Sequence, residues 1–151
     1  RVEKVWGLDP EPEMNRMARK AAESAPFEVE ILGLPGDQIP LGVASVDSVV
    51  VTFTLCTVPD TEPVLRQVRR VLKPGGELIF CEHGAAPDTD VRRRQDRVNP
   101  IWKRLAGGCH LNREIPSLLE EGGFEIRKLD TMYLPGWRPA TFNYWGTATA
   151  S

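Results

Sequence analysis

The 151-residue sequence has no long hydrophobic run, only three cysteines and almost no net charge. No apolar stretch approaches the roughly 20 residues that a helix needs to cross a bilayer, so no membrane span is expected. The stretch from Arg1 to Leu8 is too short and too polar for a secretory signal. Cys56, Cys81 and Cys109 are few and odd in number, which argues against a disulfide framework and favours a reducing, cytoplasmic setting.

The formal net charge is -2, whereas a dedicated nucleic-acid binder usually carries an excess of basic residues. No nucleic-acid partner is therefore expected. Hydrophobic residues make up 41% of the chain and charged residues 26%, as in ordinary globular proteins. The length suits one domain, 1–151, with a core of its own.

Short apolar runs alternate with helical patterns along the chain. Strands are predicted at residues 5–8, 27–34, 46–55, 77–81, 124–129 and 141–148. The run from Val46 to Leu55 is β-branched with little polar alternation, which favours a strand covered on both faces. The order β-α-β-β-α-β-(α-α)-β-β predicts an α/β fold with a mostly parallel sheet flanked by helices.

The predicted helices carry apolar residues at helical spacing. Met14, Met17 and Ala18 mark the first helix. The second begins at Asp60-Thr61-Glu62-Pro63 and buries a stripe made of Val64, Leu65, Val68, Val71 and Leu72. A third stripe is formed by Val98, Ile101, Trp102 and Leu105. Asn112 is expected to cap a short fourth helix.

Polar residues gather where the predicted strands end. In open parallel sheets, ligands bind beyond the carboxyl ends of the strands. Asp9, the stretch Thr52 to Cys56, and Cys81-Glu82-His83 all lie at such ends. Asp9 has two interpretations: an acid that binds ribose hydroxyls, or the cap of the helix that follows.

Cys81, His83, Cys109 and His110 are residue types that bind zinc. Their spacing contains no C-x-x-C, and adjacent Cys109 and His110 cannot easily share one tetrahedral site, so no metal is expected. A zinc protein using Cys81 and His83 and a Cys-His nucleophilic pair remain alternatives. Cys56 and Cys81 also suit simple packing, as small buried side chains.

A basic cluster lies between residues 92 and 104. Acidic residues interleave with it, which is typical of a solvated helix face; contact with an anionic substrate is the alternative. Its members are Arg92, Arg93, Arg94, Arg97, Lys103 and Arg104.

Three stretches resemble motifs of the class I S-adenosylmethionine-dependent methyltransferases. "VWGLDP" at 5–10 resembles the second-strand motif, "ASVDSVVVTFTLCTVPD" at 44–60 the fourth-strand motif, and "VLRQVRRVLKPGGELIFCEH" at 64–83 the helix–turn–fifth-strand motif. The methyltransferase-like thiol methyltransferases and their bacterial relatives are the most similar. That likeness is carried by "TLC" at 54–56, "EH" at 82–83, "GGC" at 107–109 and "LNRE" at 111–114.

The resemblance implies a Rossmann-like sheet, mostly parallel with an antiparallel last strand. The family's first strand and glycine-rich loop are not found in the sequence; that strand would lie between the strands ending at Asp9 and near Thr52. The implied activity is methyl transfer from S-adenosylmethionine to a small thiol, amine or lipid amine. The alternative is a truncated, inactive scaffold that forms a homodimer through its open sheet.

The resemblance also implies residue roles. Asp9 would hold the ribose hydroxyls and Pro10 would pack on the adenine. The adenine edge would lie near Gly36 and Asp37. The methionine end of the cofactor would be lined by Thr52, Phe53 and Thr54.

On the acceptor side, His83 would be the general base, or else a strand-end histidine bound to a loop. The helical segment at about 85–122 is interpreted as an insertion that covers the acceptor. Its candidate contacts are Trp102, His110 and Asn112.

Overall fold

The computed structural model describes all of residues 1–151. The chain divides into two compact units, Arg1–Leu41 and Gly42–Ser151. The extent of a single domain, 1–151, stays a prediction. The order of helices and strands matches the predicted order throughout.

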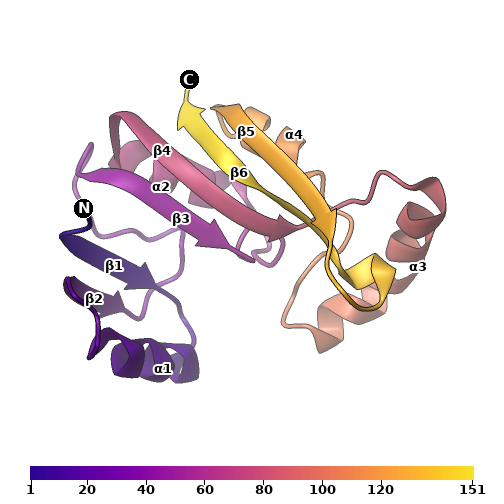
Figure 1. Cartoon of the computed structure of the whole chain (residues 1–151), viewed down its shortest axis with the longest axis horizontal. Coiled ribbons are helices and arrows are strands. Elements are labelled where there is room, and N and C mark those ends of the chain that lie inside the picture. Colours follow the sequence, from indigo (N-terminus) through magenta and orange to yellow (C-terminus); the bar gives the residue numbers. More distant parts are fainter. The chain divides into compact units, whose positions relative to one another are not determined.

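The first unit is a β-α-β arrangement. Strand β1 (Lys4–Leu8), helix α1 (Pro12–Ala22) and strand β2 (Glu28–Leu32) follow one another. The two strands are parallel neighbours, so their carboxyl ends lie at the same edge (Figure 1). Proline at the first helical position suits the start of α1, because the N–H that it lacks would have no partner inside the helix.

The buried face of α1 differs from the predicted one. Met14 and Met17 are exposed, the latter by 58%, whereas Asn15 is buried. The side-chain amide of Asn15 donates to the carbonyl oxygen of Asp9 at 2.8 Å. This polar contact with the end of β1, which apolar spacing does not register, places Asn15 on the inner face of the helix.

The second unit contains a four-stranded sheet in the order β3-β4-β6-β5. Its elements are β3 (Val46–Thr52), α2 (Glu62–Val71), β4 (Leu72–His83), α3 (Thr89–Leu105), α4 (Ile115–Glu121), β5 (Phe124–Tyr133), the 3-10 helix η1 (Arg138–Ala140) and β6 (Phe142–Ala150). β3 and β4 are parallel, and β6 is antiparallel to both of its neighbours. The predicted topology, parallel with an antiparallel last strand, is confirmed.

The core of this unit lies between the sheet and the helices α2 and α4, which lie behind it in Figure 1. The predicted stripe of α2 is fully buried. It packs with sheet residues such as Leu78, Phe80 and Phe124 and with Leu119 of α4, all below 3% exposure. Each such side chain contributes about 1.5–3 kcal/mol by leaving water.

The opposite face of the sheet does not meet the expectation for β3. Val51 is buried, but Val50 is 64% exposed and Ile79 of β4 is also exposed. Helices α2 and α4 both contribute to the core on one face of the sheet. Successive side chains of β3 point to opposite faces, so every second residue is buried even though apolar residues do not alternate with polar ones in its sequence.

The turn Lys73-Pro74-Gly75-Gly76 belongs to β4 rather than separating it from α2. The pairing of β3 with β4 jumps from Val46↔Leu72 to Ser48↔Glu77, so these residues form a bulge at the start of the strand. Gly75 has φ 78°, a conformation that favours glycine.

Helix α3 is present, but its predicted stripe is wrong. Leu105 is 81% exposed, and the buried positions are Val91, Gln95 and Asn99. The Gln95 amide nitrogen donates to the carbonyls of Gly84 and Pro139 at 3.0 and 3.1 Å, and its oxygen accepts from the N–H of Ala86 at 2.9 Å. Hydrogen bonds to loops therefore orient this helix.

The basic cluster on α3 is largely solvated, as expected, with only Arg92 half-buried. Arg92 also pairs with Glu114. None of the helices combines the length and hydropathy that crossing a membrane requires.

Candidate active site

In the first unit, the predicted cofactor residues follow the carboxyl ends of β1 and β2. Asp9 does not cap α1, because the N-cap position is Glu11 and no side chain caps this helix. Asp9 Oδ1 instead accepts a hydrogen bond from the backbone N–H of Glu11 at 2.8 Å, just before the helix. Its Oδ2 has no hydrogen-bond partner in the protein. Gly36 and exposed Asp37 lie in a turn closed by the N–H of Gln38 donating to the Pro35 carbonyl at 3.0 Å.

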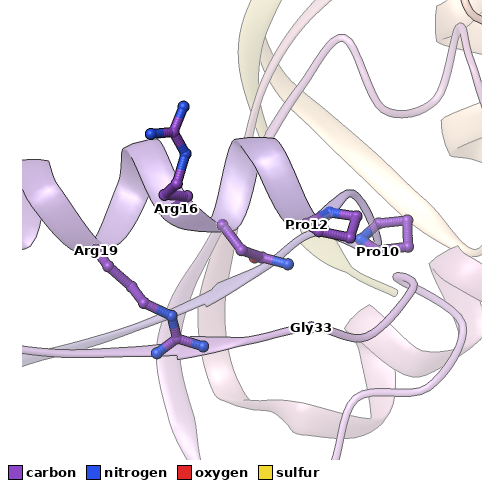
Figure 2. A pocket seen from close by; sticks show the side chains of 6 residues that line it. Pro10, Pro12, Arg16, Arg19 and Gly33 are labelled. Atoms are coloured by element: carbon purple, nitrogen blue, oxygen red, sulfur yellow. The ribbon is translucent and has the colours of Figure 1, made fainter.

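A shallow hollow lies beside Pro10 (Figure 2). It is lined by Pro10, Pro12, Asn15, Arg16, Arg19 and Gly33. The Oδ1 atom of Asn15 is buried there without a hydrogen-bond partner. The assigned contacts remain predictions.

In the second unit, the chain turns sharply after β3. Phe53 has φ 51°, which is strained for a residue with a side chain and costs on the order of 1–3 kcal/mol. Its backbone N–H donates to the Cys81 carbonyl at 2.9 Å. The Phe53 ring is partly exposed and packs on His83, with ring centroids 4.7 Å apart. Thr52 is exposed and Thr54 is half-buried beside it.

Glu82 holds the loop after β3 in place. Its side chain is fully buried and accepts from the backbone N–H groups of Thr54 at 2.9 Å and Cys56 at 3.0 Å. Burial raises the pKa of Glu82, while these N–H groups oppose the shift. From the other side, the guanidinium of Arg113 donates to the carbonyls of Leu55 and, at 3.3 Å, Pro59.

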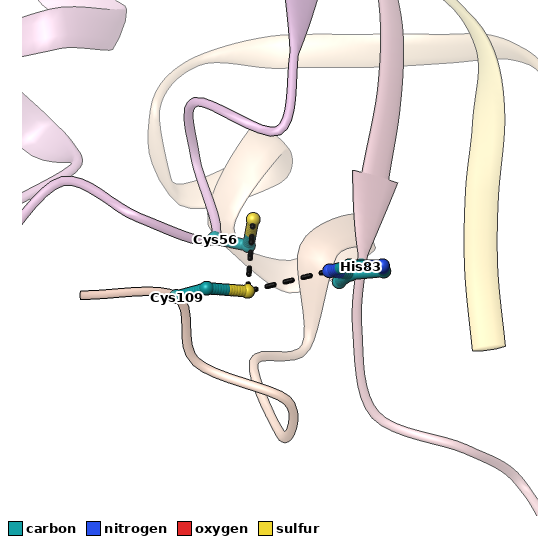
Figure 3. Close-up of side chains that lie close together, drawn as sticks. All are labelled: Cys56, His83 and Cys109. Atoms are coloured by element: carbon teal, nitrogen blue, oxygen red, sulfur yellow. Dashed lines mark hydrogen bonds between the residues drawn. The ribbon is translucent and has the colours of Figure 1, made fainter. Parts of the chain in front are cut away.

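Three donor atoms meet behind this loop (Figure 3). The Sγ of Cys109 lies 3.3 Å from His83 Nδ1 and 3.6 Å from the Sγ of Cys56. The hydrogen bond between the two thiols lowers the pKa of Cys109 to about 7. The same contact, with burial, raises the pKa of Cys56 far above its usual value. We name Cys56, His83 and Cys109 the Cys-His-Cys cluster.

The cluster differs from the groupings predicted from spacing. Of the four zinc-type residues, only His83 and Cys109 meet, and Cys56 joins them. Cys81 instead lines an apolar hollow on the exposed sheet face with Thr52 and Trp145. Cys56 is buried as expected but is not mere packing. Its position just after β3 could have indicated that it meets His83, because the parallel strands β3 and β4 end at the same edge of the sheet.

The other acceptor-side residues lie around the cluster with different partners. His110 donates its backbone N–H to the Cys56 carbonyl at 2.7 Å, and burial lowers the pKa of its ring. The indole N–H of Trp102 is buried, and its interaction with the Cys109 thiol lowers the pKa of that thiol.

The predicted cap of the fourth helix is wrong. The side chain of Asn112 donates to Asp96 at 2.8 Å, and Glu114 precedes α4. The Asn112 amide is bound by the Asp96 carboxylate on α3, and the N-cap position of α4 is Glu114. Contact of Trp102, His110 and Asn112 with an acceptor stays a prediction.

Comparison with known proteins identifies the family. The family model described as "Methyltransferase domain" matches residues 1–80, just over half of the chain. The chain belongs to this family. It is the class I, S-adenosylmethionine-dependent methyltransferase family that the strand-end motifs resemble.

Relatives and solved structures agree with this assignment to the methyltransferases. The chain is 35% identical over 145 residues to the thiol S-methyltransferase TMT1B of Rattus norvegicus, covering 93% of the chain. It is also 35% identical over 149 residues to the thiol S-methyltransferase TMT1A of Homo sapiens. The chain spans 57% and 61% of the lengths of these two relatives.

The fold is shared with a SAM-dependent methyltransferase from Methanosarcina mazei. The TM-score is 0.74 at 24% identity, over 97% of this chain and 82% of that one. This similarity supports the architecture of the methyltransferase fold.

Proposed function

We propose that this methyltransferase transfers the methyl group of S-adenosylmethionine to the sulfur of a small thiol. The support comes from relatives that are named thiol S-methyltransferases and align with 93% of the chain. The observation that carries the proposal is the convergence at the carboxyl ends of β3 and β4, where strained Phe53, half-buried His83 and the Cys-His-Cys cluster lie together. An amine or a lipid amine is the competing acceptor class.

The cofactor's sulfonium supplies a methyl group that is already activated toward a nucleophile. The protein's task is therefore to align the acceptor sulfur with the methyl carbon and to exclude water. Thr52, Phe53 and Thr54 follow β3 at the edge where ligands bind in this kind of sheet. Glu82 fixes this loop through two backbone N–H groups, so its geometry is set before a ligand arrives.

His83 is the proposed acceptor of the thiol proton. Its half-buried ring lies between exposed Phe53 and Cys109. As the new carbon–sulfur bond forms, the bond from the methyl carbon to the sulfonium breaks and its electron pair stays on the departing sulfur. Removing the acceptor's proton beforehand raises the nucleophilicity of the sulfur.

The test compares two acceptors that differ only in their nucleophilic group: 2-mercaptoethanol carries a thiol, and ethanolamine carries an amine in its place. Formation of S-adenosylhomocysteine is followed by mass spectrometry, and binding of S-adenosylhomocysteine to the chain by calorimetry. We expect binding, and turnover with the thiol only. Turnover with ethanolamine alone would move the proposal to the amine class, and the absence of both binding and turnover would contradict it.

The second candidate is the inactive scaffold. The observation that favours it is that β1 pairs only with β2 and β3 pairs only with β4, so each of these strands has a free edge. A scaffold would fold and self-associate but would not bind S-adenosylhomocysteine, so the same calorimetry separates the two candidates.

A further inference from the structure

We propose that the Cys-His-Cys cluster binds one zinc ion, and that the fourth coordination position of this ion takes the sulfur of the acceptor. The zinc site stands on the geometry of the cluster alone. The assignment of the acceptor to the fourth position rests on the proposed function.

Two of the three distances between the cluster's ligand atoms are close to those of tetrahedral zinc. Zinc–sulfur bonds of about 2.3 Å and zinc–nitrogen bonds of about 2.0–2.1 Å at tetrahedral angles separate two sulfurs by about 3.8 Å and sulfur from nitrogen by about 3.5 Å. The measured separations are 3.6 Å for Cys56 to Cys109 and 3.3 Å for His83 to Cys109, and all three donor atoms lie within 4.8 Å of one another. The site is complete once the third pair, Cys56 Sγ and the His83 ring nitrogen, closes from at most 4.8 Å to about 3.5 Å through side-chain movement.

The three ligands come from separate segments that are fixed by other contacts. The Glu82 carboxylate accepts a hydrogen bond from the backbone N–H of Cys56, and the backbone N–H of His110 donates to the carbonyl of Cys56. Gly108 has φ 95°, and a Cβ there would lie 3.2 Å from the carbonyl oxygen of Thr57. Glycine thus allows Cys109 to approach closely. Such surrounding contacts are what orient metal ligands in proteins.

A divalent ion would balance the negative charges that metal binding creates in the cluster. Two thiolates would carry two negative charges into a buried position that also contains the carboxyl group of Glu82. Arg113, half-buried beside the same loop, can balance that carboxylate, and a divalent ion can balance the two thiolates. Thiol hydrogen bonds are weak, so they offer little reason to gather two cysteines and a histidine.

Three protein ligands leave one position open, which is the pattern of catalytic rather than structural zinc sites. A thiol that takes this position loses its proton to solvent and binds as a thiolate. Its sulfur then attacks the methyl carbon, and the electron pair of the broken bond stays on the departing sulfur. The neutral thioether product is a poorer ligand and leaves. In the metal-bound chain His83 would be a ligand through Nδ1 and the thiol proton would go to solvent, so the base role proposed above belongs to the metal-free site.

Cobalt(II) is the spectroscopic probe for this site, because thiolate-to-cobalt charge transfer absorbs strongly in the near ultraviolet. The reduced chain is titrated with cobalt, which is then displaced with zinc. We expect one cobalt per chain, and a band reduced to about half or less in Cys56→Ser and Cys109→Ser, since each removes one of two thiolates. The matched control Cys81→Ser, which removes the third cysteine outside the cluster, should leave the band unchanged.

The proposal is overturned if the reduced, folded chain gives no zinc-displaceable band, or if Cys81→Ser weakens the band as much as Cys109→Ser. If the cluster variants do not fold, the test is the thermal unfolding midpoint of the unaltered chain and of Cys81→Ser, each measured with and without zinc. Zinc must raise the midpoint of both, because a ligand that binds only the folded state stabilises it. Adding 2-mercaptoethanol, but not ethanolamine, should shift the cobalt spectrum. Binding of S-adenosylhomocysteine without any metal binding would refute this inference and leave the proposed function standing.

Discussion

At the scale of single residues, Glu82 offers a sharp stability test. Replacing it by alanine leaves the N–H groups of Thr54 and Cys56 without their acceptor in a buried position. We expect Glu82→Ala to lower the free energy of unfolding by about 2–4 kcal/mol, measured by urea denaturation.

The matched control is Glu77→Ala, on the same strand but exposed. It should change the free energy of unfolding by no more than about 0.5 kcal/mol. Similar losses in the two variants would show that Glu82 does not hold the loop.

How far the site could be predicted also depends on particular residues. Asp9 could be placed at the end of β1 from its apolar run alone. Thr52 to Thr54 and His83 could be placed together because each comes at the end of an apolar run and the parallel strands β3 and β4 end at one edge. The role of Cys109 could not, because it lies in a loop whose path depends on the left-handed glycine Gly108 and on a contact with Cys56, 53 residues away in the sequence.

At the scale of elements, the pairing of β5 with β6 depends on one glycine. A Cβ on Gly146 would overlap the backbone carbonyl of Lys128, next to an irregularity in the register of the two strands. We expect Gly146→Ala to destabilise the fold by about 3 kcal/mol or more, because backbone atoms cannot yield as a side chain can.

For comparison, Gly42→Ala adds a methyl group whose nearest neighbour is Ser45 Cβ at 4.0 Å. Thermal unfolding of the two variants checks the expectation, and a midpoint shared by Gly146→Ala and Gly42→Ala would contradict it.

The same scale shows why some helices could be predicted fully and others only in outline. The stripe of α2 was predicted correctly because its packing is entirely apolar. In α1 and α3 the inward-facing residues include Asn15, Gln95 and Asn99, which serve loop carbonyls and N–H groups. The spacing of apolar residues carries no information on such hydrogen bonds. It therefore predicted that these helices form but not which of their faces is buried.

At the scale of the whole molecule, the exposed apolar face and the free edge of β3 bear on self-association. Homodimer formation through the open sheet stays a prediction, and it can be measured by light scattering across a range of concentrations. If the sheet is the interface, Val50→Lys should shift the mass toward that of a monomer at no cost in stability, because Val50 is already exposed. A monomeric mass for the unaltered chain would contradict the prediction.

The carboxylate of Glu82 also has a dynamic consequence. The amides of Thr54 and Cys56 lie in a loop, where exchange with solvent deuterium is normally fast. Because both are bound to a buried group on β4, they can exchange only when the ends of β3 and β4 separate. We expect their exchange rates to match those of the paired strand amides, and the loop and the strand to open as one unit.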